Sequence, residues 1–258
     1  MSEQNLPPAL QPALYLVSTP IGNREDITLR ALRVLRSARL IACEDTRTTG
    51  RLLELLQIPA PKLIAVHDHN ERGSAERIAE HIRAGNIVAY CSDAGTPGIS
   101  DPGFVLVREM IALGIPVVPI PGASAVITAL VAAGAPCQPF TFVGFAPHKK
   151  GRKTFLDALV QRSETVVMFE SPFRIAKLVD ELCQRCPERR VTIARELTKM
   201  YEEFIRGSVR EVQAMLASRP PLKGEMVVIL HGGGGGMEQD GNDDEAGERS
   251  NAGETEIL

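Results

Sequence analysis

Short apolar runs alternate with longer stretches of helical periodicity along the first half of the chain. The short runs contain four or five residues and are rich in Val, Ile and Leu, which is typical of strands buried on both faces of a parallel sheet. They predict strands at residues 13–17, 40–43, 63–66, 87–91 and 117–120. The intervening stretches predict helices at 29–38, 52–56, 74–83, 104–111 and 125–133. Strands and helices in this alternation indicate βαβ units and a mostly parallel sheet.

The rhythm changes after residues 134–139, where small residues and prolines suggest a domain boundary. Strands are expected at 140–145, 165–169, 191–194, 203–206 and 225–230, and helices at 155–161, 175–183 and 209–216. We therefore expect two α/β domains, of which the N-terminal one has a mostly parallel sheet and the C-terminal one a mixed sheet. The expected divisions are an N-terminal extension at 1–12, domains at 13–136 and 137–231, and a Gly-rich, acidic, disordered tail at 232–258.

The loop at residues 93–103 stands out between a predicted strand and a predicted helix. It holds three glycines and two prolines in eleven residues, far above average usage. Glycine allows a close approach of the backbone to a ligand, and proline fixes φ. The loop follows the carboxyl end of a strand, where open α/β sheets bind ligands. We interpret it as a binding loop, with Asp101 as an N-cap of the next helix.

Charge and cysteine content narrow the class of protein. Net charge is −3, but the segment after Gly232 has eight acids and one arginine, so the preceding chain is near +4, with 28 basic and 24 acidic residues. Such a body is compatible with an anionic partner. Five cysteines, an odd number, favour reduced thiols in a cytoplasmic protein, and no signal peptide is apparent. Residues 111–147 carry no charged side chain, but prolines and glycines interrupt them, which favours buried interior over a membrane span.

Eight motifs spread over nearly the whole chain resemble one known family. They are STPIGN at 18–23, EDTR at 44–47, HDHNE at 67–71, SDAGTPGISDPG at 92–103, PGASA at 121–125, FESPFR at 169–174, ARELTK at 194–199 and KGEMVVIL at 223–230. Together they resemble the tetrapyrrole-methylase-fold, class III S-adenosylmethionine methyltransferases. Within that family the chain looks like the members that methylate a ribose 2′-oxygen of a cytidine in 16S rRNA.

The resemblance implies a cofactor cleft between the two domains, S-adenosyl-L-methionine as methyl donor, the 30S ribosomal subunit as substrate, and a homodimer. Two alternatives share the fold. One is a C-methyltransferase acting on a tetrapyrrole such as uroporphyrinogen or a precorrin, which would need a cleft for a polycarboxylate macrocycle. The other is a non-catalytic ribosome-binding protein.

The chemistry of a sulfonium donor points to particular residues in these motifs. A positively charged sulfur favours a carboxylate and carbonyl oxygens, adenine needs an apolar slot, and small residues that open a helix allow the anionic end of the ligand to approach free N–H groups. In the first domain the candidates are Pro20, Asp93, Gly95, Thr96, Pro97, Ile99, Ser100, Ser124 and Ala125. By resemblance, Phe169, Glu170, Ala194 and Glu225 of the second domain also contact the cofactor. For Glu170 and Glu225, a cap or a surface ion pair is the equal alternative.

A ribose hydroxyl is a weak acid, so a methyl transfer to it needs a group that orients or deprotonates it. The candidates are Glu44, Asp45, Arg47 and Lys199. For Asp45, capping of the following helix explains the residue equally well.

Basic and polar residues elsewhere suggest contacts with RNA. Lys149, Lys150, Arg152 and Lys153 form the densest basic cluster, which we interpret as a phosphate contact rather than a solvated turn. His67, His69 and Asn70 are expected near the RNA entrance. Two histidines at a strand end are more often surface groups than metal ligands, so no metal site is expected.

Overall fold

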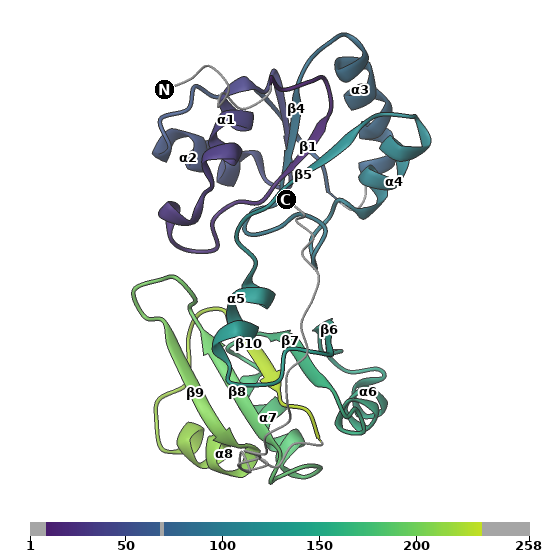
Figure 1. Cartoon of the computed structure of the whole chain (residues 1–258). Coiled ribbons are helices and arrows are strands. Elements are labelled where there is room, and N and C mark those ends of the chain that lie inside the picture. Colours follow the sequence, from purple (N-terminus) through teal and green to yellow (C-terminus); the bar gives the residue numbers. More distant parts are fainter. Residues whose placement is uncertain (1–8, 68–69, 234–258) are drawn as a thin grey trace, which may run out of the picture.

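Five parallel strands form the sheet of the first half of the protein (Figure 1). The computed structural model describes residues 9–67 and 70–233. The strands are β1 (Leu14–Val17), β2 (Leu40–Cys43), β3 (Lys62–Ala65), β4 (Val88–Cys91) and β5 (Val117–Ile120), in the spatial order β3-β2-β4-β1-β5. All four pairings are parallel, which confirms the predicted sheet type.

Helices cover both faces of this first sheet, which explains why its central strands are apolar. They are α1 (Leu29–Ser37), α2 (Thr46–Leu55), α3 (Glu71–Arg83) and α4 (Phe104–Ala112). Val34 and Leu53 of α1 and α2 pack against one face, and Ile78 and Leu106 of α3 and α4 against the other. β2 and β4 are buried along their whole length.

The second half is built on a mixed sheet, as predicted. Its strands are β6 (Phe140–Phe145), β7 (Thr165–Glu170), β8 (Arg190–Arg195), β9 (Glu203–Ser208) and β10 (Met226–Leu230), in the order β6-β7-β10-β8-β9. β6 and β7 are parallel, whereas the other three pairings are antiparallel. α6 (Arg152–Val160), α7 (Ile175–Cys183) and α8 (Val209–Ala217) contribute to the apolar cluster on one face.

Helix α5 (Ala125–Ala132) covers the other face of the second sheet although it follows β5 of the first. Val126, Ala129 and Leu130 pack with Val167 of β7 and Ile229 of β10. The Thr192 hydroxyl donates to the carbonyl of Ala133, 3.1 Å away, at the end of this helix. The predicted domain boundary at residue 136 stays a prediction, and α5 packs with the elements beyond it.

The element boundaries differ from the prediction where caps act. α2 begins at Thr46, six residues earlier than expected, because the Asp45 carboxylate accepts the amide of Arg47 at 2.8 Å as an N-cap. The predicted N-cap role of Asp101 is wrong. Gly103 is the N-cap residue of α4, and the amide of Leu106 donates instead to the buried Glu71 carboxylate, at 2.6 Å.

No helix in the described ranges has the length and apolarity that crossing a membrane requires. The uncharged stretch at 111–147 is divided among β5, α5 and β6.

Gly103 occupies a position that excludes a side chain. Its φ is +130°, and an added Cβ would lie 2.7 Å from a ring carbon of Tyr90, which is fully buried. Gly103→Ala should therefore lower the free energy of unfolding by about 2–4 kcal/mol through backbone strain and overpacking. The shift of the urea midpoint at unchanged slope measures this effect.

Gly73→Ala is the matched control, because this glycine lies in α3 and its added Cβ meets nothing within 4 Å. It should raise stability by up to about 1 kcal/mol, since alanine is the better helix former. Equal effects of the two substitutions would contradict the packing described for Gly103.

Candidate functional site

Three loops meet where the central strands of the first sheet end. The amide of Thr19 donates to the Gly95 carbonyl at 2.9 Å, and the amide of Gly95 donates back to Thr19 at 3.0 Å. The hydroxyls of Ser18 and Thr96 lie 3.0 Å apart, and Thr96 donates to the carbonyl of Ala123, also at 3.0 Å. The loops after β1, β4 and β5 are thereby fixed to one another at the carboxyl ends of the strands, where open α/β sheets bind ligands.

A strained turn of the second half packs directly against the loop after β1. Glu196 and Thr198 in this turn have φ values of 51° and 65°, a region in which a β-branched residue is rare. The Thr198 hydroxyl accepts the amide of Asn23 at 3.0 Å. A Cβ on Gly22 would lie 2.7 Å from the same hydroxyl oxygen and 3.0 Å from the Leu197 carbonyl oxygen. Close contact between the two halves therefore depends on glycine at position 22.

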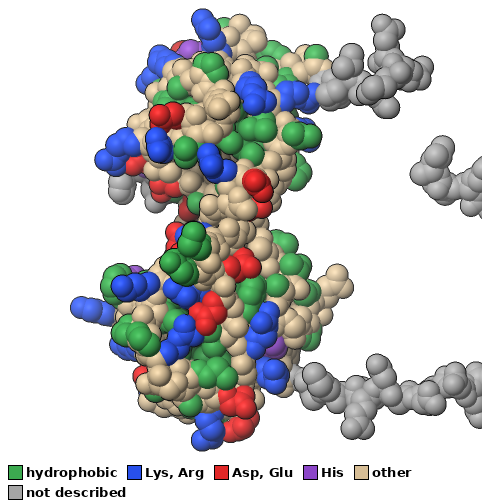
Figure 2. All heavy atoms as spheres, turned by 90° about the vertical axis from the view of Figure 1, so that its left-hand side faces the viewer, with side chains coloured by type: hydrophobic (Ala, Val, Ile, Leu, Met, Phe, Trp, Pro, Cys, Tyr) green, Lys and Arg blue, Asp and Glu red, His purple; other side chains and the backbone are tan. Residues whose placement is uncertain are grey.

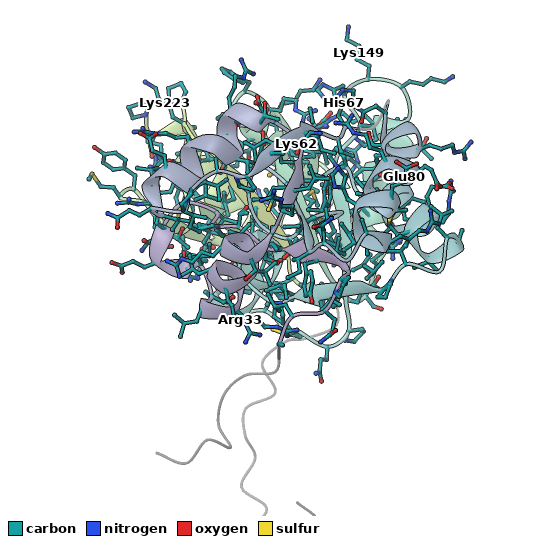
Figure 3. All side chains as sticks on the ribbon, turned by 90° about the horizontal axis from the view of Figure 1, so that it is seen from above. Arg33, Lys62, His67, Glu80, Lys149 and Lys223 are labelled. Atoms are coloured by element: carbon teal, nitrogen blue, oxygen red, sulfur yellow. The ribbon has the colours of Figure 1, made fainter. Side chains whose placement is uncertain are left out.

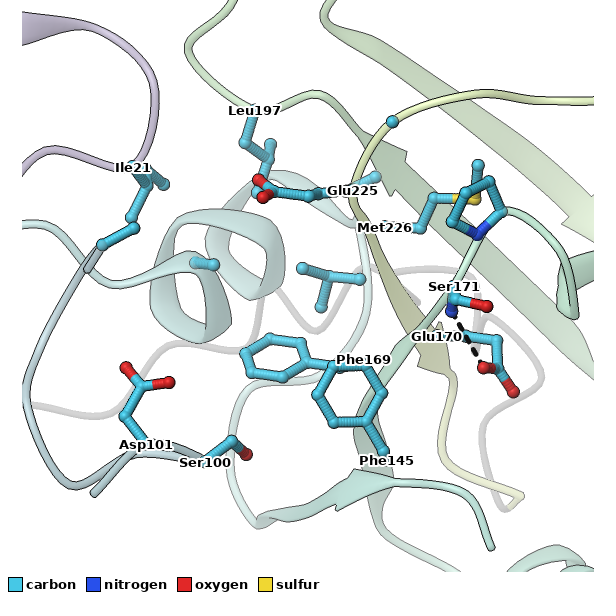
Figure 4. A pocket seen from close by; sticks show the side chains of 16 residues that line it. Ile21, Ser100, Asp101, Phe145, Phe169, Glu170, Ser171, Leu197, Glu225 and Met226 are labelled. Atoms are coloured by element: carbon cyan, nitrogen blue, oxygen red, sulfur yellow. Dashed lines mark hydrogen bonds between the residues drawn. The ribbon is translucent and has the colours of Figure 1, made fainter. Parts of the chain in front are cut away.

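A cavity of about 330 Å³ opens beside this contact, between the two halves (Figure 4). Ile21 and Asp101 reach it from the first half, opposite Leu197 and Phe169 of the second. Phe169 contacts the rings of Phe142 and Phe145, with centroids 5.0 and 5.4 Å away. The cavity volume is within the range of small-molecule sites, and the mixture of apolar walls with a few carboxylates suits an amphipathic ligand.

The structure brings six of the thirteen predicted cofactor residues to the wall of this cavity. They are Ser100, Ala125, Phe169, Glu170, Ala194 and Glu225. The other seven do not line it and lie on the neighbouring first-half loops, namely Pro20, Asp93, Gly95, Thr96, Pro97, Ile99 and Ser124. Burial is the main cause that raises the pKa of Asp93, whose carboxylate accepts the amide of Asp45 at 3.2 Å.

Several residues of the wall were not predicted. They are Ile21, Ala94, Asp101, Phe145, Ser171, Pro172, Leu197, Gly224, Met226 and Val227. All except Phe145 lie inside the motifs quoted above, so treating each motif as a whole would have found them. Phe145 ends β6 opposite Phe169 of β7, a pairing that only the register of the strands reveals.

Three comparisons with known proteins identify the family of the chain. The sequence profile of the Tetrapyrrole (Corrin/Porphyrin) Methylases matches residues 13–213. A protein of Halalkalibacterium halodurans named Ribosomal RNA small subunit methyltransferase I is 45% identical over 226 residues, which cover 87% of this chain and 78% of the relative. A Vibrio cholerae protein of the same name is 46% identical over 242 residues, covering 93% and 84%.

The chain belongs to the tetrapyrrole methylase family.

The solved structures agree on the fold. The crystal structure of uroporphyrin-III C-methyltransferase from Thermus thermophilus, complexed with S-adenosylhomocysteine, superposes with a TM-score of 0.56. Its identity is 20%, over 84% of this chain and 97% of that one. The expected fold class is thus confirmed, and the chain is a methyltransferase, as the family resemblance implied.

Glu170 lies at the cavity wall, but its carboxylate turns away from Phe145 and Phe169 toward the backbone of Ser171 (Figure 4). It accepts the amide of Ser171 at 2.8 Å and pairs with Arg174, with 2.6 Å between nitrogen and oxygen. The side chain is fully buried. Glu170 thus forms a buried ion pair rather than the surface pair offered as the alternative, and its contact with the cofactor stays a prediction.

Arg152 does not belong with the exposed basic cluster, which corrects the prediction for this residue. Its guanidinium is buried and pairs with Glu181 at 2.7 Å and with Glu170 at 3.7 Å. It also donates to the carbonyl of Pro147. Because the side chain is turned inward to these acceptors, it does not present an open phosphate contact. Lys149, Lys150 and Lys153 are exposed, and Lys149 extends away from the body of the protein (Figure 3).

Among the predicted catalytic residues of this methylase, Asp45 and Arg47 form a fork. Arg47 donates from Nε and Nη2 to the Asp45 carboxylate, the shortest distance being 2.6 Å. Hydrogen bonds from the Arg47 side chain lower the pKa of Asp45 to about 2. Asp45 therefore remains an anion that caps α2 and orients Arg47. Glu44, half-buried, follows β2 beside the loop after β4.

Lys199 closes a small ionic network next to the cavity. Its ammonium lies 2.8 Å from the Glu225 carboxylate and 3.0 Å from that of Glu196. Burial lowers the pKa of Lys199, but hydrogen bonds to Glu225 and Glu196 outweigh this effect, so the pKa is raised overall. Lys199 is thus cationic at neutral pH and is suited to orienting an anion rather than accepting a proton.

The predicted RNA-entrance residues lie at the end of β3. His67 is exposed, and its amide donates to the Asn70 side chain at 2.9 Å. His69 lies outside the described residues. In the ranges that the structure covers, no group of three or more His, Cys, Asp and Glu side chains is arranged to hold a metal ion.

The network around Lys199 predicts a specific titration. The amide of Glu225 is the largest cause that lowers the pKa of Glu196, and the Lys199 hydrogen bond adds to it. Lys199→Met should therefore raise the Glu196 pKa while leaving it below its ordinary value. A carbon-13 NMR titration of labelled glutamate carboxyls measures this shift.

The effect of the same substitution on the free energy of unfolding should depend on pH. A lowered carboxyl pKa stabilises the fold above the unfolded pKa, and this stabilisation is lost as the pH falls through the folded pKa. The stability difference between wild type and Lys199→Met should thus be present at neutral pH and shrink in acid. Lys223→Met, an exposed lysine in the strand-connecting loop nearby, should leave the Glu196 titration unchanged. An unmoved Glu196 in Lys199→Met would contradict the network.

Proposed function

We propose that this methyltransferase transfers a methyl group from S-adenosyl-L-methionine to a ribose 2′-oxygen of a cytidine in 16S rRNA of the 30S subunit. The relatives named Ribosomal RNA small subunit methyltransferase I support the RNA substrate. The observation that carries the proposal is the cavity between the two halves, whose walls combine aromatic and aliphatic side chains with the carboxylates of Asp101 and Glu225.

The residues present fit a sulfonium donor. Ile21, Phe145, Phe169 and Leu197 offer apolar surface for a nucleoside base, and Ala125 opens α5 with a small side chain. Burial is the main cause that raises the pKa of Asp101, and the Ser92 hydroxyl opposes it. When bound, the donor supplies an activated methyl group on a positively charged sulfur. A wall containing two carboxylates favours that charge over a neutral ligand.

The transfer forms a bond between the ribose 2′-oxygen and the methyl carbon and breaks the carbon–sulfur bond, leaving S-adenosylhomocysteine. The proton of the 2′-hydroxyl must leave as the methyl arrives. We assign Glu44 to contact with this hydroxyl and Arg47, whose side chain is 90% exposed, to a neighbouring phosphate. Asp45 holds Arg47 in position, and Lys199 orients Glu225 at the cavity wall.

We propose RNA contacts on both halves of the molecule. Phe145 lines the cavity, and the exposed Lys149, Lys150 and Lys153 follow it closely in the chain. His67 and Asn70 follow the carboxyl end of β3 in the first sheet. Because the proposed substrate is a ribosomal subunit, we propose a cytoplasmic location.

Two experiments separate this proposal from its alternatives. Incubation of 30S subunits from cells lacking this protein with labelled donor should label a cytidine whose 3′-linkage resists alkali, the signature of a blocked 2′-oxygen. Parallel incubation with uroporphyrinogen should transfer no label. Label in the macrocycle would favour the tetrapyrrole alternative, and donor binding without transfer to either substrate would favour the non-catalytic one.

Filling the cavity tests the donor site directly. Ala125→Leu places a larger side chain on the wall and should weaken S-adenosylhomocysteine binding, measured by calorimetry, by more than about tenfold. Methyl transfer to 30S subunits should fall in parallel. Ala112→Leu, at the exposed end of α4, is the control and should change neither quantity. Unchanged affinity in Ala125→Leu would place the donor elsewhere.

We also propose a homodimer that forms through α5. Ile127 and Val131 are large apolar side chains that lie one turn apart on this helix, and they are 49% and 70% exposed. Ile127→Asp combined with Val131→Asp should convert a dimer to a monomer in light scattering, because burying a carboxylate without a partner is costly. Ile111→Asp on α4, also exposed, should remain dimeric. A monomeric wild-type protein would overturn this assignment.

A further inference from the structure

Helix α1 carries an unusual charge pattern. Residues 27–43 contain four arginines and no Asp, Glu or Lys. Arg30, Arg33 and Arg36 recur at every third position of α1, and Arg39 follows its end. Arg30, Arg36 and Arg39 are exposed, and Arg33 is half-buried. We call these four residues the α1 arginine stripe.

The stripe lacks the carboxylate partners that many other arginines of the described residues have. Within residues 9–67 and 70–233, no ion pair involves any of its four members. On neighbouring helices, by contrast, Arg51 pairs with Glu54 and Arg83 with Glu76, each at 2.7 Å. The positive charge of the stripe is therefore not neutralised inside the described fold.

This charge pattern destabilises α1. Like charges three residues apart repel by about 0.2–0.5 kcal/mol per pair, and a cation in the first turn opposes the helix dipole. The first turn of α1 has no acidic residue and contains Arg30. Residues that destabilise their own helix or strand are expected where function requires them. An anionic ligand across the stripe would remove the repulsion.

A short stretch of chain connects the stripe to the proposed active site, although Arg33 lies on the other side of the molecule from His67 and Lys149 (Figure 3). Ile21 lines the cavity, and the chain runs from it through a short turn, Arg24–Asp26, into α1. Lys and Arg side chains gather over the face of the first half on which α1 and α2 lie, with few acidic side chains between them (Figures 1 and 2). Arg30 and Arg36 are separated by about 9 Å along the helix axis, so the stripe is long enough to contact more than one phosphate of a strand.

We infer that the α1 arginine stripe binds the phosphate backbone of the RNA substrate. The inference rests on the proposed function and adds a first-half surface to the lysines after β6. Guanidinium groups bind phosphate oxygens in a bidentate manner, which suits a backbone contact without base reading. A membrane surface fits less well, because the apolar face of α1, formed by Ala31, Val34 and Leu35, is buried in the core and is not free to insert.

The salt dependence of binding tests the inference. Arg30→Gln, Arg36→Gln and Arg39→Gln are combined, sparing the half-buried Arg33. Binding to 30S subunits is measured over a range of salt concentrations. Loss of three phosphate contacts should reduce the slope of log affinity against log salt by about 2, at roughly 0.7 per single-strand contact. The KM for 30S subunits should rise, whereas S-adenosylhomocysteine affinity and kcat should stay unchanged.

A variant with the same charge change provides the control. Arg72→Gln, Arg77→Gln and Arg83→Gln, all exposed on α3, also remove three positive charges. Their salt slope should equal that of the wild type. An equal loss of slope in both variants would show a non-specific charge effect and would overturn the inference, as would an unchanged slope in the stripe variant.

Three further outcomes are distinguishable. Wild-type methylation of 30S subunits together with an unaffected stripe variant would reject the stripe and leave the proposed function standing. Absence of methylation by the wild type would reject the proposed function, whatever the binding data show. Binding of the wild type to phosphatidylglycerol vesicles that the stripe variant loses, at unchanged 30S affinity, would assign the stripe to a membrane instead.

Discussion

Contact between the two halves depends on a strained turn held between two glycines. Thr198 in this turn keeps a left-handed conformation that costs on the order of 1–3 kcal/mol for a non-glycine residue. Gly22 leaves room for its hydroxyl, and Gly224 leaves room for the Glu196 side chain. The turn also positions Leu197 at the cavity and Lys199 beside Glu225. Without this contact, the cavity wall from the second half would not face the loops of the first.

Much of the fold follows from periodicity in the sequence. The central strands of the first sheet are apolar because helices cover both faces, and such runs are recognisable without a structure. The change to a mixed sheet was visible in the altered spacing after residue 139. The start of α4 was predicted, but its capping residue was not, because Glu71 accepts the amide of Leu106 from another helix. Such a cap joins residues 35 positions apart, which local patterns do not reveal.

The site was predictable as a set of loops but not in detail. Motifs located the segments that meet. They did not show which residues line the cavity and which hold the loops together, because this depends on backbone hydrogen bonds such as that between Thr19 and Gly95. Arg152 shows what the sequence alone does not reveal. In the sequence it belongs to a basic run, and its burial depends on Glu170 and Glu181, which reach it from another strand and helix. A run of like charges does not reveal which member is neutralised from a distance.

The placement of α5 has a consequence for motion. Because this helix packs with the second sheet, residues 121–124 form the covalent link between β5 and the body to which α5 belongs. The same short link touches the loops after β1 and β4, through Gly122 against Ser18 and Ala123 against Thr96. The covalent connection between the halves is thus held by the same loops that carry the predicted cofactor residues of the first half. A rotation of one half against the other would bend the chain next to those loops rather than at a distance from them.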